Sequence, residues 1–166
     1  MNNKVVTTLA RACEDSYAVA LRFNFRGVGG SEGDYDGGSG ELEDAKAVVD
    51  WARETWPGTP LILAGFSFGG AIAVRLASER RPVSLVTVAP AVDRIPEGQL
   101  RPGCEWLVVQ GDRDDMVEPA KVLRRLEEFE PPPLIRLMEG AGHFFHGRLV
   151  ELRGIVREHL SAAVAS

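Results

Sequence analysis

The chain has 166 residues, 45% of them hydrophobic and 26% charged, which fits one globular domain with a core of its own. Its net charge is −5, so it lacks the basic excess of a nucleic-acid-binding protein. The two cysteines, Cys13 and Cys104, are far apart and form no C-x-x-C pair, which argues against a disulfide scaffold or a structural zinc site.

The sequence contains no segment with the length and apolarity of a membrane span. The N-terminal stretch MNNKVVTTLARACEDS lacks the apolar core of a signal peptide. We therefore expect a soluble, cytoplasmic protein with reduced thiols and with no membrane or nucleic-acid partner.

Helix and strand patterns alternate from the N-terminus onwards. Apolar residues at i, i+4, i+7 and i+8 from Val5 predict an amphipathic helix. Segment 17–25 has the pattern of a strand, and a glycine-rich loop follows over 26–40. Segment 41–56 has the acidic start and the apolar stripe of a helix.

The second half of the chain continues this alternation. Short apolar runs predict four more strands, at 60–66, 83–89, 105–110 and 134–138. Three helices are predicted, at 69–80, 119–129 and 146–163. Such an order predicts a single α/β domain over residues 1–166, with a mostly parallel sheet of about five strands and helices on both faces.

The glycine-rich loop 26–40 follows a predicted strand, as phosphate-binding loops do. It contains no lysine, which the P-loop pattern requires, and the G-x-G-x-x-G pattern fails at Glu32. No helix begins directly after these glycines to offer its N-terminus to a phosphate. We therefore expect no nucleotide cofactor, and we interpret the segment as a flexible loop at the edge of the sheet where ligands approach.

The sequence GFSFGG, residues 65–70, contains the pattern G-x-S-x-G around Ser67. A sharp turn from strand to helix would lift the serine hydroxyl above the sheet, and side chains two positions either side would clash. Gly65 and Gly69 remove that clash, and the predicted strand before and helix after supply the required context.

A serine nucleophile needs a base, and the base needs an acid that orients it. The segment GDRDDMVEP follows the strand at 105–110, and GAGHFFHG follows the strand at 134–138. Both lie past the carboxyl ends of strands, on the same edge of a parallel sheet as Ser67. Their order, Ser…Asp…His, is the order expected on such an architecture.

Four segments in this order resemble motifs of the α/β-hydrolase superfamily, and within it the small lidless bacterial serine hydrolases. They are RFNFRGVGGSEG, GFSFGG, GDRDDMV and GHFF, and the similarity runs from about residue 3 to 160. The family's G-x-x-D-x-x-V turn, matched to GDRDDMV, implies Asp114 as the acid. Its histidine loop, matched to GHFF, implies His143 as the base.

The resemblance also implies a role for each residue. Ser67 attacks an acyl carbonyl, and His143 takes the serine proton and later protonates the leaving group. Asp114 fixes the imidazole tautomer and stabilises the imidazolium. The backbone N–H of Phe68 supplies one donor of the oxyanion hole, and neither a metal nor a cofactor takes part.

Two of these assignments have local alternatives. Ser67 is also the residue type favoured at a helix N-cap. Asp112 and Asp115 compete with Asp114, since aspartates are common in turns for local reasons. We favour Ser67 as the nucleophile and Asp114 as its acid.

The histidine has competitors as well. His159 lies within a helical pattern, where packing or exposure explains it, and His146 stands at the start of the last predicted helix. We favour His143 over both. A metal site built on His143 and His146 is not expected, because no further cluster of ligand residues accompanies them.

Relatives with this fold have more sheet before the point that matches residue 1, so the resemblance implies a truncated α/β-hydrolase fold without its N-terminal strands. The third strand of that fold would lie between 17–25 and 60–66, and the loop after it would supply the second oxyanion donor. The two segments either close up and pair, or leave a gap that another chain fills. Exposed apolar strand edges of this kind favour a homodimer.

Our first hypothesis is a serine hydrolase that cleaves carboxylic esters or related small acyl compounds through an acyl-enzyme intermediate. Segment 90–103 is too short for a lid domain, which predicts an open site for small or soluble substrates. One alternative is a catalytically impaired, non-catalytic or dimeric protein. Another is an acyltransferase that uses the same three residues.

Overall fold

The structure is a computed structural model that describes residues 3–98 and 100–164. Its centre is a parallel sheet whose strands follow one another in chain order, β1-β2-β3-β4. The strands are β1 (Ile62–Phe66), β2 (Ser84–Val88), β3 (Glu105–Gly111) and β4 (Leu134–Met138). All four carboxyl ends lie at one edge, which is where ligands bind open α/β sheets.

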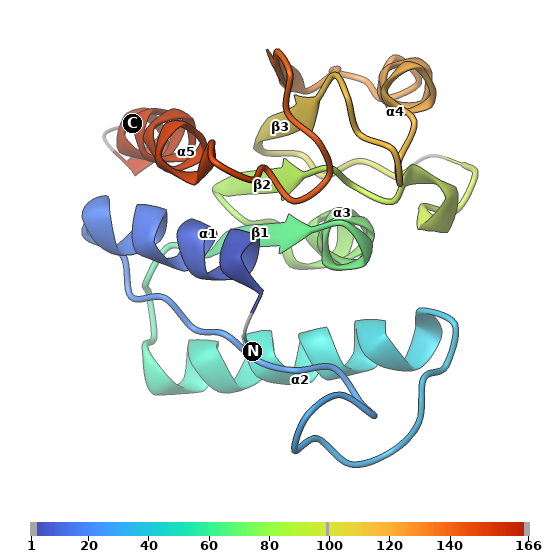
Figure 1. Cartoon of the computed structure of the whole chain (residues 1–166). Coiled ribbons are helices and arrows are strands. Elements are labelled where there is room, and N and C mark those ends of the chain that lie inside the picture. Colours follow the sequence, from blue (N-terminus) through green and yellow to red (C-terminus); the bar gives the residue numbers. More distant parts are fainter. Residues whose placement is uncertain (1–2, 99, 165–166) are drawn as a thin grey trace.

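Helices cover both faces of the sheet, as predicted (Figure 1). On one face, α1 (Lys4–Asp15) and α5 (Leu149–Val164) share an apolar cluster with the strands. On the other, α3 (Phe68–Arg80) and α4 (Pro119–Leu126) form a second cluster, to which α2 (Ser39–Thr55) adds its apolar stripe. A short 3₁₀ helix, η1 (Val92–Arg94), follows β2. The predicted α/β fold is thus confirmed.

Helix α1 shows how the sequence determines a local element. The Asn3 side chain accepts hydrogen bonds from the backbone N–H groups of Val5 and Val6, at 2.9 and 3.2 Å, and so caps the helix. The apolar stripe predicted from Val5 is buried, and Leu9 and Ala12 share one apolar cluster with residues of α5.

The prediction of a strand over 17–25 is wrong. This segment has no regular secondary structure, and the sheet has four strands rather than about five. Strand geometry requires a hydrogen-bonded neighbour, and within residues 3–98 and 100–164 β1 pairs only with β2. Apolar side chains that suit a strand are consequently left in solvent, with Tyr17 fully exposed and Val19 73% exposed.

A groove of about 630 Å³ separates this segment from β1. Its walls also include α1, α2 and α3, and its lining is mostly apolar, with Leu21 and Phe25 on one side and Leu63 on the other. The two segments therefore do not close up and pair, and the gap that the resemblance implied is open.

Candidate active site

Ser67 occupies the sharp turn between β1 and α3. Its backbone has φ 52° and ψ −118°, a conformation that costs energy for any residue other than glycine. The turn is held by its neighbours, because the Ser67 N–H donates to the Val88 carbonyl at 2.9 Å and the Ala91 N–H donates to the Ser67 carbonyl at 3.0 Å. These hydrogen bonds maintain the strained turn, and the turn presents the Ser67 hydroxyl above the end of the sheet.

The glycines around Ser67 are not equivalent. A Cβ on Gly65 would lie 2.3 Å from the Gly69 carbonyl oxygen, so only glycine fits there. A Cβ on Gly69 would meet only the Phe25 ring at 3.9 Å, an ordinary contact. The tighter second position is Gly70, whose Cβ would lie 3.3 Å from Pro90. The steric reason predicted for Gly65 thus holds, and the one predicted for Gly69 does not.

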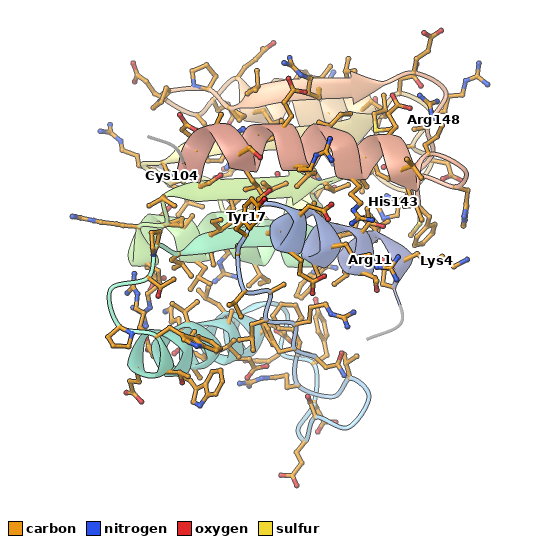
Figure 2. The ribbon with its side chains drawn as sticks, turned by 90° about the vertical axis from the view of Figure 1, so that its left-hand side faces the viewer. Lys4, Arg11, Tyr17, Cys104, His143 and Arg148 are labelled. Carbon is orange, nitrogen blue, oxygen red and sulfur yellow. The ribbon has the colours of Figure 1, made fainter. Side chains whose placement is uncertain are left out.

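His143 lies in the loop after β4, at the end of the sheet beyond the strand tips (Figure 2). Its Nε2 is 3.2 Å from the Ser67 hydroxyl, and its Nδ1 is 2.8 Å from Oδ2 of Asp114. The carboxylate can only accept, so we assign the proton to Nδ1, which leaves Nε2 to accept from the serine. The buried imidazole also packs against the rings of Phe66 and Phe144.

Asp114 is buried in the turn after β3. Its Oδ1 accepts hydrogen bonds from the backbone N–H groups of Met116 and Val117, at 2.9 and 2.8 Å. Its Oδ2 accepts from His143 and from the side-chain amide of Gln110, at 2.8 and 3.1 Å. Each carboxylate oxygen thus has two donors, which hold the orientation of the side chain.

The competing aspartates lie elsewhere. Asp112 is exposed, and its Oδ1 accepts from the Gly140 N–H at 2.6 Å, so it joins the loops after β3 and β4. Asp115 is exposed on the same turn. Of the three, only Asp114 contacts His143.

The competing histidines are also separate from Ser67. His146 is exposed, and its ring lies at a tilt to the Phe144 ring, 5.9 Å away. His159 lies on α5 and shares a 3.0 Å hydrogen bond with Ser84 at the opposite end of β2. Burial lowers the pKa of His159, an effect that the charge of Glu105 opposes.

Ser67 stands at the N-cap position of α3, yet its side chain makes no capping hydrogen bond. The hydroxyl is directed to His143 instead. The Phe68 N–H, at the first position of that helix, makes no hydrogen bond to any described residue. A substrate oxygen near Ser67 can therefore use it, at the positive end of the helix dipole.

The glycine-rich loop is braced by charged side chains. Arg26 donates to Asp44 from its backbone and from its guanidinium, and Glu41 accepts from the backbone N–H groups of Asp36 and Gly38. Burial acts to raise the pKa of Glu41, but these hydrogen bonds outweigh it and leave the pKa below its ordinary value. The loop expected to be flexible is thus anchored to α2.

Neither cysteine competes with Ser67 as a nucleophile. Cys13 and Cys104 are both free, and burial, followed by a neighbouring glutamate, raises the pKa of each thiol to about 11. Both are therefore protonated at neutral pH, and a protonated thiol is unreactive.

Metal and membrane sites are also absent from the described residues. In residues 3–98 and 100–164, no group of three or more His, Cys, Asp or Glu side chains is placed to hold a metal ion. Over those same ranges, no helix combines the length and the apolarity needed to cross a bilayer.

Gln110 was missed by the sequence prediction, which assigned it only as the last residue of a strand. It is fully buried and touches Asp114. A signal was present, because a lone amide ends an otherwise apolar run directly before the GDRDDMV turn. Polar groups buried in this way require hydrogen-bond partners, which the sequence could not identify.

The chain is similar to known proteins over most of its length. Residues 4–107 match the family model for serine aminopeptidase, S33. The uncharacterized protein RP471 of Rickettsia prowazekii (strain Madrid E) is 33% identical over an alignment of 174 residues, which covers 96% of this chain and 72% of that protein.

Solved structures match nearly the whole chain. An alpha-beta serine hydrolase homologue from Coxiella burnetii is 44% identical with a TM-score of 0.91, covering 96% of this chain and 77% of its own. The Xanthomonas campestris protein XC6422, described as an a/b serine hydrolase without lid, is 41% identical with a TM-score of 0.93. That match covers 98% of this chain and 74% of the other.

Proposed function

Because this chain belongs to the α/β serine hydrolase family, we propose that it cleaves carboxylic esters or related small acyl compounds through Ser67, His143 and Asp114. One observation carries the proposal. Three side chains from the ends of β1, β3 and β4 form a continuous hydrogen-bonded chain, with contacts of 3.2 and 2.8 Å. Serine hydrolysis needs this order of nucleophile, base and orienting acid.

The proposed reaction proceeds in two stages. The Ser67 oxygen attacks the acyl carbonyl while His143 Nε2 takes its proton, and the resulting imidazolium is stabilised by Asp114. His143 returns the proton to the leaving alcohol, which leaves an ester between Ser67 and the acyl group. Water then attacks this ester, with His143 again as base, and releases the acid and the free serine.

The Phe68 N–H stabilises the oxyanion that forms in each stage. It is the one donor proposed from this chain, and loss of a single donor costs roughly 10²–10³ in rate in comparable sites. In the described part of the connection after β2, residues 89–98 and 100–104, the regular structure is the 3₁₀ helix η1. We propose that so short a connection leaves the site open, and that small or soluble acyl substrates are preferred over long lipids.

A fluorophosphonate probe tests the nucleophile. We expect it to label the purified protein at Ser67, and we expect Ser67→Ala to remove the label completely, because only an activated serine reacts. Ser78→Ala is the matched control, since Ser78 lies on the same helix α3 and donates only to the Val74 carbonyl. An unlabelled, folded wild-type protein would exclude the proposal.

The groove favours a second candidate, a catalytically impaired protein that works as a homodimer. Apolar side chains such as those of Tyr17 and Val19 are exposed at its rim, and exposed patches of this kind mark interaction sites. Under this proposal a second copy covers the groove, and the serine remains without turnover.

Light scattering during size exclusion distinguishes the two candidates. A groove-mediated dimer is expected to dissociate in Val19→Glu, because a charge cannot be buried unpaired in an apolar interface. Val150→Glu, which alters an 88% exposed residue on α5, is the matched control and should keep the mass unchanged. A monomeric wild-type protein with esterase activity would eliminate this candidate.

A further inference from the structure

We propose that Gln110 is a positioning residue for the reaction: its side-chain amide holds Oδ2 of Asp114 in line with His143. The proposal rests on the proposed function of Ser67, His143 and Asp114. Gln110 lies near the end of β3 with its side chain wholly buried. Its Nε2 is 3.1 Å from Asp114 Oδ2 and 3.2 Å from the Gly111 carbonyl oxygen.

The orientation of the Gln110 amide follows from its surroundings. Both groups around Nε2 are acceptors, a carboxylate and a backbone carbonyl. A flipped amide would place Oε1 against two oxygens, so the nitrogen must occupy this position. Gln110 is therefore a donor to Asp114, and an acceptor at this site would repel the carboxylate.

The other end of the same amide shows that stability alone does not explain Gln110. Its Oε1 is buried and has no hydrogen-bond partner among the described residues. An unpaired carbonyl in the core costs free energy, which an apolar side chain of similar length would avoid. The residue thus bears a structural cost while it supplies one donor to Asp114, as residues at functional sites often do.

The donor acts on the oxygen that faces the base. Asp114 Oδ2 accepts from only two groups in the described structure, His143 Nδ1 and Gln110 Nε2. The Asp114 side chain is 0% exposed, so bulk water does not take the place of a lost donor. Without Gln110, the carboxylate keeps its backbone anchors on Oδ1 but loses the contact that determines its rotation toward His143.

Two variants separate positioning from packing. Gln110→Met removes both the donor and the unpaired carbonyl while it keeps the length of the side chain. We expect its kcat on p-nitrophenyl acetate to fall about 10–100-fold, with KM and thermal stability maintained.

Gln110→Glu keeps the shape but donates to Asp114 only when it is protonated. The ratio of its kcat to the wild-type kcat at the same pH should be highest at low pH and should fall as the pH rises.

The control is Thr87→Val. Thr87 accepts a buried hydrogen bond from the Trp106 indole at 3.0 Å, within the same sheet and away from Asp114. This variant should lose stability and keep the wild-type kcat and pH profile. A purely structural Gln110 would give the reverse pattern in Gln110→Met, with lost stability and an unchanged kcat, and that result would overturn the proposal.

Proton NMR provides a readout that does not need turnover. A histidine Nδ1 proton shared with a buried carboxylate resonates strongly downfield, and we expect that signal for His143 in the wild type and in Thr87→Val. In Gln110→Met it should move upfield or broaden, and its persistence unchanged would refute the positioning role. If Ser67 takes no fluorophosphonate label while Gln110→Met still shifts the signal, the proposed hydrolysis fails and the positioning role stands.

Discussion

Replacing Asp114 by asparagine is expected to lower kcat for ester hydrolysis about 10⁴-fold while the protein remains folded. The amide has nearly the same shape as the carboxylate and can still accept from the Met116 and Val117 N–H groups through one oxygen. Its nitrogen would then face His143 Nδ1 as a donor. The neutral imidazole would then carry its proton on Nε2 instead of Nδ1. A protonated Nε2 cannot take the serine proton. Steady-state kinetics with p-nitrophenyl acetate measures the effect.

The neighbouring aspartates are matched controls for this prediction. Asp112→Asn and Asp115→Asn change the same charge on the same turn without contact with His143. Both should keep kcat within a few-fold of wild type. If either of them lost as much activity as Asp114→Asn, the assignment of the acid would be incorrect.

A second large effect is expected for stability, from Gly65→Ala. The added Cβ would lie 2.3 Å from the Gly69 carbonyl oxygen, which is backbone and cannot rotate away. The turn would have to shift, and with it the strained Ser67. We expect a loss of roughly 3 kcal/mol or more in the free energy of unfolding, at the upper end of the range for overpacking.

Gly69→Ala is the matched variant for urea denaturation. It adds the same methyl group four residues later, where the nearest neighbour is the Phe25 ring at 3.9 Å. Alanine also favours the helix in which this position lies, so its stability should equal or exceed that of wild type. Equal losses in the two variants would show that the close contact at Gly65 is not the cause.

The sequence predicted which loops carry the candidate site residues, but it predicted one strand too many for the sheet. The helices were recognisable from apolar stripes, such as that of α1 from Val5, and the four strands of the sheet from short apolar runs. Segment 17–25 carries the side chains of a strand, but a strand also needs a hydrogen-bonded neighbour. Side-chain pattern contains no information about that neighbour, so the prediction failed there.

The candidate site also contains residues that the sequence indicated and residues that it did not. Ser67, Asp114 and His143 were proposed from short motifs whose order places them at one edge of a parallel sheet. Gln110 was not, because a buried amide is informative only once the atoms around it are known. The different requirements at Gly65, Gly69 and Gly70 also depend on what approaches each one across the turn.

By itself, the sequence determined the α/β alternation, the strand-to-helix turn at Ser67 and the short list of acids and bases that follow later strands, because these depend on local periodicity and motif order. The sequence favoured Asp114 over Asp112 and Asp115, but only the tertiary structure shows its contact with His143, since that contact depends on how the loops after β3 and β4 approach each other. It also decided that the groove beside β1 is open, because only the packed chain shows which backbone edges find a partner.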